Sequence, residues 1–144
     1  MTVFLAAVAV ILTDQASKYV IARHMALHES VPVIPGFFHI TYILNKGAAF
    51  GFLENKQWLF IAVAAALFLL YFICRKHQPK KRIVRCGMGF LLGGALGNAV
   101  DRFFFGAVTD FFDFRVWPVF NVADIGIIIG VGLLVLYCWT HDSE

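Results

Sequence analysis

Charged residues are scarce in this sequence. Only 15% of its 144 residues are Asp, Glu, Lys or Arg, whereas 60% are hydrophobic and sixteen are Phe. A soluble domain of this length has too little interior to bury so much apolar surface. The composition therefore excludes an ordinary soluble domain and predicts a single membrane-embedded domain over residues 1–144.

Several common catalytic and metal-binding motifs are also absent. The three cysteines have no CxxC spacing, the five histidines form no HExxH pair, and no Gly-x-Ser-x-Gly sequence occurs. Zinc sites, structural disulfides and serine nucleophiles are therefore not indicated, and without a Walker lysine neither is a nucleotide-binding loop. We expect no metal, no cofactor and no nucleic-acid partner.

Long apolar runs are what the chain has instead. A helix needs about 20 residues to cross the roughly 30 Å of hydrocarbon in a bilayer. Four stretches approach this length, and Trp, Lys and Arg near their ends fit spanning helices. The first run contains Asp14 and Lys18, so we expect a retained helix rather than a cleaved signal peptide. The predicted spans are residues 2–22, 58–74, 83–100 and 119–139.

The basic residues predict an orientation. Half of the twelve Lys and Arg residues lie between Arg75 and Arg85, in or just after the link between the second and third spans. By the positive-inside rule this link is cytoplasmic. Both termini would then be cytoplasmic, and the other two links would face outward.

The first outward link is too long for a tight turn. From Phe38 to Leu44, β-branched and aromatic residues alternate in part with others, which favours short strands, and Asn45-Lys46-Gly47 favours a turn. Pro32, Pro35 and Gly36 would separate these strands from a preceding short segment. We predict a small β-cradle over residues 31–55, either as a structured loop or as a platform that holds an extended substrate.

The third span combines small and polar residues. Gly89, Gly93 and Gly97 share one helix face, which predicts close packing against another helix. Asn98, Asp101 and Arg102 then lie together at its outer end. Asp101 and Arg102 could form an ion pair, or Asp101 could cap the helix. Asn98 and Arg102 need peptide carbonyls or carboxylates as partners if they lie deep in the membrane.

Two further aspartates, Asp110 and Asp124, flank an aromatic stretch at the outward boundary, and Asn121 shares the helix face of Asp124. A carboxylate beside lipid costs about 2.5–3.5 kcal/mol near a helix centre, so such residues are functional candidates. If the two converge, one keeps a proton near neutral pH and the other remains a base, which suits peptide hydrolysis. Alternatively, each caps a helix or meets Arg102 or Arg115.

Asp14 and Lys18 lie four residues apart on one helix face, which favours a structural ion pair. Two other functions remain open at this point. An ion transporter would be expected to place its carboxylates near the membrane midplane or along a crossing path. A scaffold would explain the glycines and aromatics but does not require a cluster of polar residues.

Several ordered motifs resemble lipoprotein signal peptidase (signal peptidase II), a family of bacterial membrane aspartic proteases. The resemblance covers almost the whole chain. Its motifs are Asp14-Gln15-Ala16-Ser17-Lys18, residues 45–51 (NKGAAFG), residues 93–102 (GGALGNAVDR), residues 106–111 (GAVTDF) and Phe120-Asn121-Val122-Ala123-Asp124.

The resemblance implies a mainly α fold of four transmembrane helices with a small periplasmic β-cradle, in the bacterial inner membrane. It implies removal of the signal peptide from prolipoproteins, just before a cysteine that carries diacylglyceryl. The active site would lie at the outer face. We expect a monomer whose partners are these prolipoproteins and membrane lipids. Asp110 and Asp124 match the catalytic pair, and the positions that match site-shaping or substrate-contacting residues are Asn98, Arg102, Asn121, Asn45 and Asp14, with Asp101 beside them.

Overall fold

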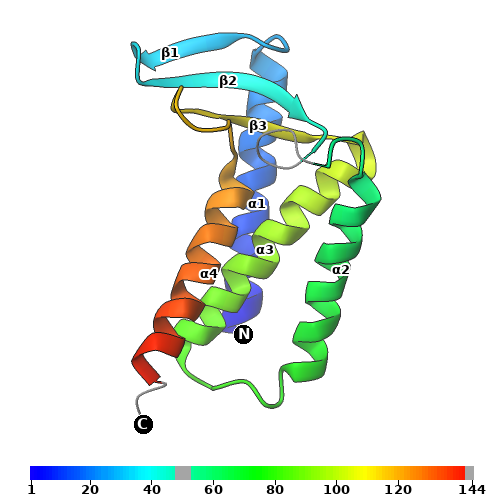
Figure 1. Cartoon of the computed structure of the whole chain (residues 1–144), viewed down its shortest axis with the longest axis vertical. Helices are drawn as coiled ribbons and strands as arrows, with labels where there is room; N and C mark the ends of the chain where they lie inside the picture. Colours follow the sequence, from blue (N-terminus) through cyan, green and yellow to red (C-terminus); the bar gives the residue numbers. More distant parts are fainter. Residues whose placement is uncertain (48–52, 142–144) are drawn as a thin grey trace.

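Four long helices and a small antiparallel sheet form the structure, a computed structural model that describes residues 1–47 and 53–141 (Figure 1). In those two ranges, the four helices are long and apolar enough to cross a membrane. The elements, in chain order, are α1 (Thr2–His24), β1 (Ser30–Ile34), β2 (Phe38–Asn45), α2 (Gln57–Cys74), α3 (Arg82–Phe105), β3 (Val108–Asp113) and α4 (Val122–His141).

The sheet lies at one end of the helices, and the start of α1, the α2–α3 link and the last turn of α4 lie at the other end (Figure 1). Its strand order is β1-β2-β3, and both pairs are antiparallel. β3 comes from the segment between α3 and α4. Gly106, with a φ of 69°, ends α3 in the left-handed conformation and turns the chain directly into this strand.

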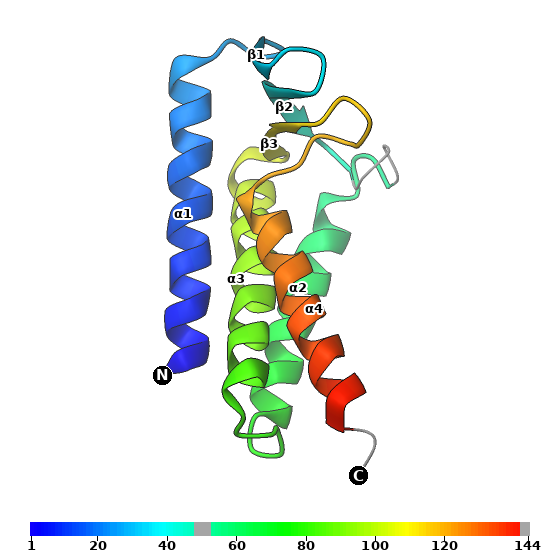
Figure 2. The same ribbon diagram turned by 90° about the vertical axis from the view of Figure 1, so that its left-hand side faces the viewer.

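α3 is the central helix, in contact with each of the other three (Figure 2). Its glycines allow this. A Cβ added at Gly93 would lie 2.7 Å from the carbonyl oxygen of Ala7 in α1, and Gly89 and Gly97 also meet α1 closely. Gly94 faces α4 instead, against the backbone at Ala123. The close helix packing predicted from the glycine spacing is confirmed.

The predicted fold class, four membrane helices with a small sheet, is also confirmed. The sheet contains one strand that was not predicted: β3 lies outside the predicted cradle of residues 31–55. Pro32 does not separate segments but lies within β1, where it pairs with His39 beside a bulge. An edge strand tolerates proline because one side of its backbone needs no partner. Residues 48–52 of the predicted cradle lie outside the described residues.

A pair of glycine substitutions tests the packing. Gly93→Ala should lower the free energy of unfolding by about 1–3 kcal/mol, because its new methyl group meets the backbone of Ala7. Gly132→Ala in α4 is the control, since a Cβ there has no neighbour within 4 Å. Its unfolding free energy should change by less than about 1 kcal/mol. Thermal unfolding in detergent measures both; equal stability of the two variants would contradict close α1–α3 packing.

Candidate active site

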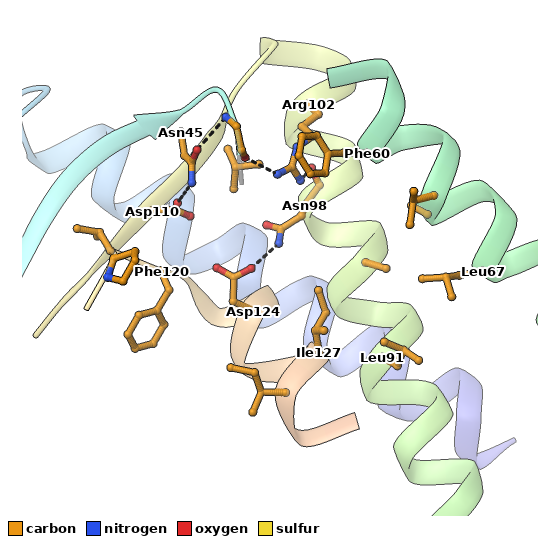
Figure 3. A pocket seen from close by; sticks show the side chains of 18 of the residues that line it. Asn45, Phe60, Leu67, Leu91, Asn98, Arg102, Asp110, Phe120, Asp124 and Ile127 are labelled. Carbon is orange, nitrogen blue, oxygen red and sulfur yellow. Dashed lines mark hydrogen bonds between the residues drawn. The ribbon is translucent and has the colours of Figure 1, made fainter. Parts of the chain in front are cut away.

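A cavity of about 750 Å³ opens between α2, α3 and α4, directly beneath the sheet. Its end near the sheet is polar, and the part between the helices is apolar (Figure 3). The polar lining residues are Asn45, Asn98, Arg102, Asp110 and Asp124, and the apolar ones include Phe60, Val63, Leu67, Leu91, Ile127 and Ile128.

Asp124 enters the cavity from the first turn of α4. The carboxylate accepts hydrogen bonds from the backbone N–H of Asn121 at 3.1 Å and from the Asn98 side-chain amide at 2.8 Å. The side chain of Asn121 accepts one in return from the backbone N–H of Asp124. This reciprocal pairing is a capping box, and the positive end of the helix dipole favours negative charge here.

Asp110 reaches the same cavity from β3, and it is 2% exposed. Two amides donate to its carboxylate: that of Asn45, in the neighbouring strand β2, at 2.9 Å and that of Asn121 at 2.6 Å. Burial and the nearby charge of Asp124 raise the pKa of Asp110 to about 7, against the opposing effect of these two donors. Near neutral pH this carboxyl therefore exists in both its protonated and its ionised form.

The Asn98 and Asn121 side chains connect the two carboxyl groups. Asn121 donates to Asp110 and also, at 3.0 Å, to the amide oxygen of Asn98, whose own NH₂ group donates to Asp124. Asn121 is fully buried. Because each amide bonds on both its oxygen and its nitrogen, the orientation of both side chains is fixed.

A buried ionic cluster lies behind these amides. The ammonium group of Lys18 lies 2.8 Å from Asp14 and 3.0 Å from Asp101, and it donates to the amide oxygen of Asn98 at 3.1 Å. Asp14 also accepts the backbone N–H of Ala123 in α4, and Asp101 accepts that of Thr109 in β3. The cluster thus connects α1 with α3, β3 and α4.

Arg102 lines the cavity opposite the carboxyl groups (Figure 3). Its guanidinium group donates to the carbonyl oxygens of Gly47 and Asn98 and lies over the Phe60 ring, 4.3 Å from the ring centre. Considering residues 1–47 and 53–141 only, Nε of Arg102 is buried without a hydrogen-bond partner. The ion pair suggested for Asp101 and Arg102 is replaced by the pairing of Asp101 with Lys18.

The structure therefore gathers most of the predicted residues around one space. Asp110, Asp124, Asn45, Asn98 and Arg102 line the cavity. Asn121 lies just behind the two carboxyl groups, and Asp14 and Asp101 lie further back in the Lys18 cluster. No three His, Cys, Asp or Glu side chains in the described ranges converge as metal ligands would.

Sequence reasoning missed some contributors. It assigned Lys18 only to Asp14, although Lys18 also bonds Asn98, and it gave no role to Gln15, whose amide donates to Asp101 at 2.9 Å. The four-residue spacing of Asp14 and Lys18 was the one available signal. No sequence signal indicated the contacts of Arg102 with Phe60 and with the Gly47 carbonyl, because both residues are distant from Arg102 in sequence.

Comparisons with known proteins agree with this architecture. The family model described as "Signal peptidase (SPase) II" matches residues 6–140. Curated lipoprotein signal peptidases of Halothermothrix orenii and Pelotomaculum thermopropionicum are 41% and 46% identical, over 98% and 100% of this chain and 97% and 95% of their own length.

Solved structures agree as well. One is described as "Bacterial membrane enzyme structure by the in meso method at 2.3 A resolution", with a TM-score of 0.87 and 36% identity, over 99% of this chain and 92% of that one. A second, at 1.9 Å, has a TM-score of 0.83 and 37% identity, over 94% and 91%. The family resemblance seen in the motifs is confirmed: this chain belongs to the signal peptidase II family, and it is a multi-pass membrane protease that removes signal peptides from prolipoproteins.

Proposed function

We propose that this chain is an aspartic endopeptidase in which Asp110 and Asp124 are the catalytic dyad. It cuts a prolipoprotein just before the cysteine that carries diacylglyceryl. The observation that carries the proposal is the convergence of two differently placed carboxyl groups on one cavity, held by a shared pair of amides. Asp110 has a pKa near 7, and Asp124 lies among N–H donors at a helix start.

Each carboxyl group then has its own task. Asp124, ionised, takes a proton from a water molecule, whose oxygen attacks the carbonyl carbon of the scissile bond. Asp110 gives its proton to the carbonyl oxygen, and a neutral tetrahedral diol forms. In the second half, Asp124 protonates the leaving nitrogen while Asp110 recovers a proton from the diol, and the C–N bond breaks. The products are an acid and an amine, and the dyad returns to its initial single-proton state.

The rest of the cavity suits a lipid-anchored peptide. Its apolar part, between α2 and α4, offers a place for apolar segments of the substrate, and Asn45 and Asp110 from the sheet line its polar end. Arg102 and Asn98 supply N–H donors beside the dyad that orient the substrate backbone. Lipid anchoring raises the effective concentration of the scissile bond, so little sequence recognition is needed.

The topology follows from charge. With the basic α2–α3 link in the cytoplasm, both termini are cytoplasmic and the dyad lies at the outer face of the bacterial inner membrane. One copy contributes all residues of the dyad and of its amides, which supports a monomeric enzyme formed by a single domain over residues 1–144.

Cleavage by dyad variants tests the proposal. Asp110→Asn and Asp124→Asn should each lower the cleavage rate of a diacylglyceryl-modified precursor at least about 100-fold, because each removes one half of the proton transfer. A gel-shift assay measures cleavage, with the unmodified precursor alongside. Asp113→Asn is the matched control on the same strand, because Asp113 bonds Thr41 and Arg115 away from the cavity. Full activity of either dyad variant would exclude the mechanism.

The pH profile tests the role of Asp110. Because its protonated form is required, kcat/KM should fall as pH rises through a midpoint near 7. Asn45→Ala removes a donor that stabilises the charged carboxylate, so the pKa of Asp110 rises and this midpoint should move to higher pH. An unchanged or lower midpoint in the variant would show that Asp110 is not the titrating acid.

Asp14 should behave differently from the dyad. Asp14→Ala leaves Lys18 with fewer buried partners and should lower the unfolding free energy by about 3–5 kcal/mol. The folded fraction should keep most of its activity, whereas Asp110→Asn should lose activity without loss of stability. Thermal unfolding and cleavage are measured on the same samples. Normal stability with lost cleavage in Asp14→Ala would contradict a structural role.

A further inference from the structure

A second cavity, of about 520 Å³, lies at the opposite end of the molecule from the dyad. Its walls are formed by the start of α1, the end of α2, the α2–α3 link and the first turn of α3. These segments lie at the end of the helices away from the sheet (Figure 1). The lining includes four basic side chains, Arg75, Lys76, Lys80 and Arg85. Nothing in the proposed cleavage reaction uses this cavity.

Among residues 1–47 and 53–141, the four cations, which are all exposed, lack neutralising partners. In the described ranges, no carboxylate lies within 4 Å of any of them. Arg75 instead lies over the ring of Phe72, with 5.3 Å between the guanidinium carbon and the ring centre. Four positive charges around one cavity attract an anion with several oxygen acceptors.

Two helix starts add to this potential. α1 and α3 both begin at this end, and neither has a side-chain hydrogen bond that caps its first N–H groups. Free N–H groups and the helix dipole at such starts favour phosphate-like anions. The cations and the backbone therefore select the same kind of ligand.

The surroundings select an amphiphile over a free anion. Phe4 lines the cavity and is 70% exposed, and Ile73 on α2 is 64% exposed. Both lie in helices that are apolar enough to span a membrane. Acyl chains can therefore lie along these helices, on the membrane side of the charged residues. We propose that this cavity, through Arg75, Lys76, Lys80 and Arg85, binds the phosphate headgroup of an anionic glycerophospholipid. Basic pockets between membrane helices are known to hold such headgroups.

A lipid titration of the purified full-length chain, followed by native mass spectrometry, tests the site. The probes are phosphatidylglycerol, zwitterionic phosphatidylcholine and inorganic phosphate. Lys76→Gln/Lys80→Gln removes two cavity cations. Lys81→Gln/Arg82→Gln removes two charges from the same link, but neither of these residues lines the cavity. The two pairs therefore change the net charge, and the positive-inside signal, equally.

Phosphatidylglycerol should bind the wild type and the Lys81/Arg82 variant with similar Kd, and the Lys76/Lys80 variant about 30-fold more weakly. Phosphatidylcholine and inorganic phosphate should bind weakly to all three. Equal losses in both double variants would overturn the proposal in favour of general surface attraction, and phosphate binding as tight as that of the lipid would make this a free-anion site. Asp110→Asn should bind the lipid normally, so the result is independent of the cleavage mechanism.

Discussion

Polar side chains inside a membrane-spanning bundle have no water to bond, so each must find its partners within the protein. In this chain the ammonium group of Lys18 is the common partner of three buried polar side chains, Asp14, Asp101 and Asn98. It bonds Asp14 and Asp101, which in turn accept backbone N–H groups from α4 and β3, and it bonds the amide oxygen of Asn98. The amide of Asn98 is thereby turned toward Asp124. Within this cluster, Asp101 and Asn98 position β3 and the Asp124 side chain, whereas Asp14 holds α1 against the start of α4.

Close helix packing makes these bonds possible. At Gly97, α3 comes so close to α1 that the Asp14 side chain lies against the glycine. At Gly93, one helical turn earlier, α3 comes equally close to the backbone of Ala7. At the sheet, the pairing of β2 with β3 brings Asn45 within hydrogen-bond distance of Asp110. The two carboxyl groups thus come from a strand and a helix start, and their surroundings differ accordingly.

Much of this arrangement could be predicted from the sequence. Apolar runs of nearly 20 residues identify membrane helices, and glycines four residues apart identify a packing face, because both patterns are local. Asn121 and Asp124 are three residues apart at a helix start, so their mutual contact was also predictable. The family motifs then indicated which polar residues share a site.

Long-range partners could not be predicted in the same way. Asp101 stands next to Arg102 in sequence, yet its partner is Lys18 in another helix, because the direction of a side chain around α3 decides the contact. Apolar and polar residues do not alternate along β3. This agrees with its burial, because nearly every residue from Val108 to Asp113 is buried. A strand covered on both faces cannot be distinguished from other short apolar segments by periodicity. The pairing with Asn45 that defines the surroundings of Asp110 therefore required the structure.

Infrared difference spectroscopy across a pH titration tests most directly the proposal that Asp110 holds the single proton of the Asp110–Asp124 pair. A protonated carboxyl group has a C=O band that a carboxylate lacks. The account predicts a component of this band that disappears as pH rises through about 7, is missing in Asp110→Asn, and persists in the control Asp113→Asn. If that component remained in Asp110→Asn, or if no carboxyl band titrated in the wild type near this pH, the proposed division between acid and base would be wrong.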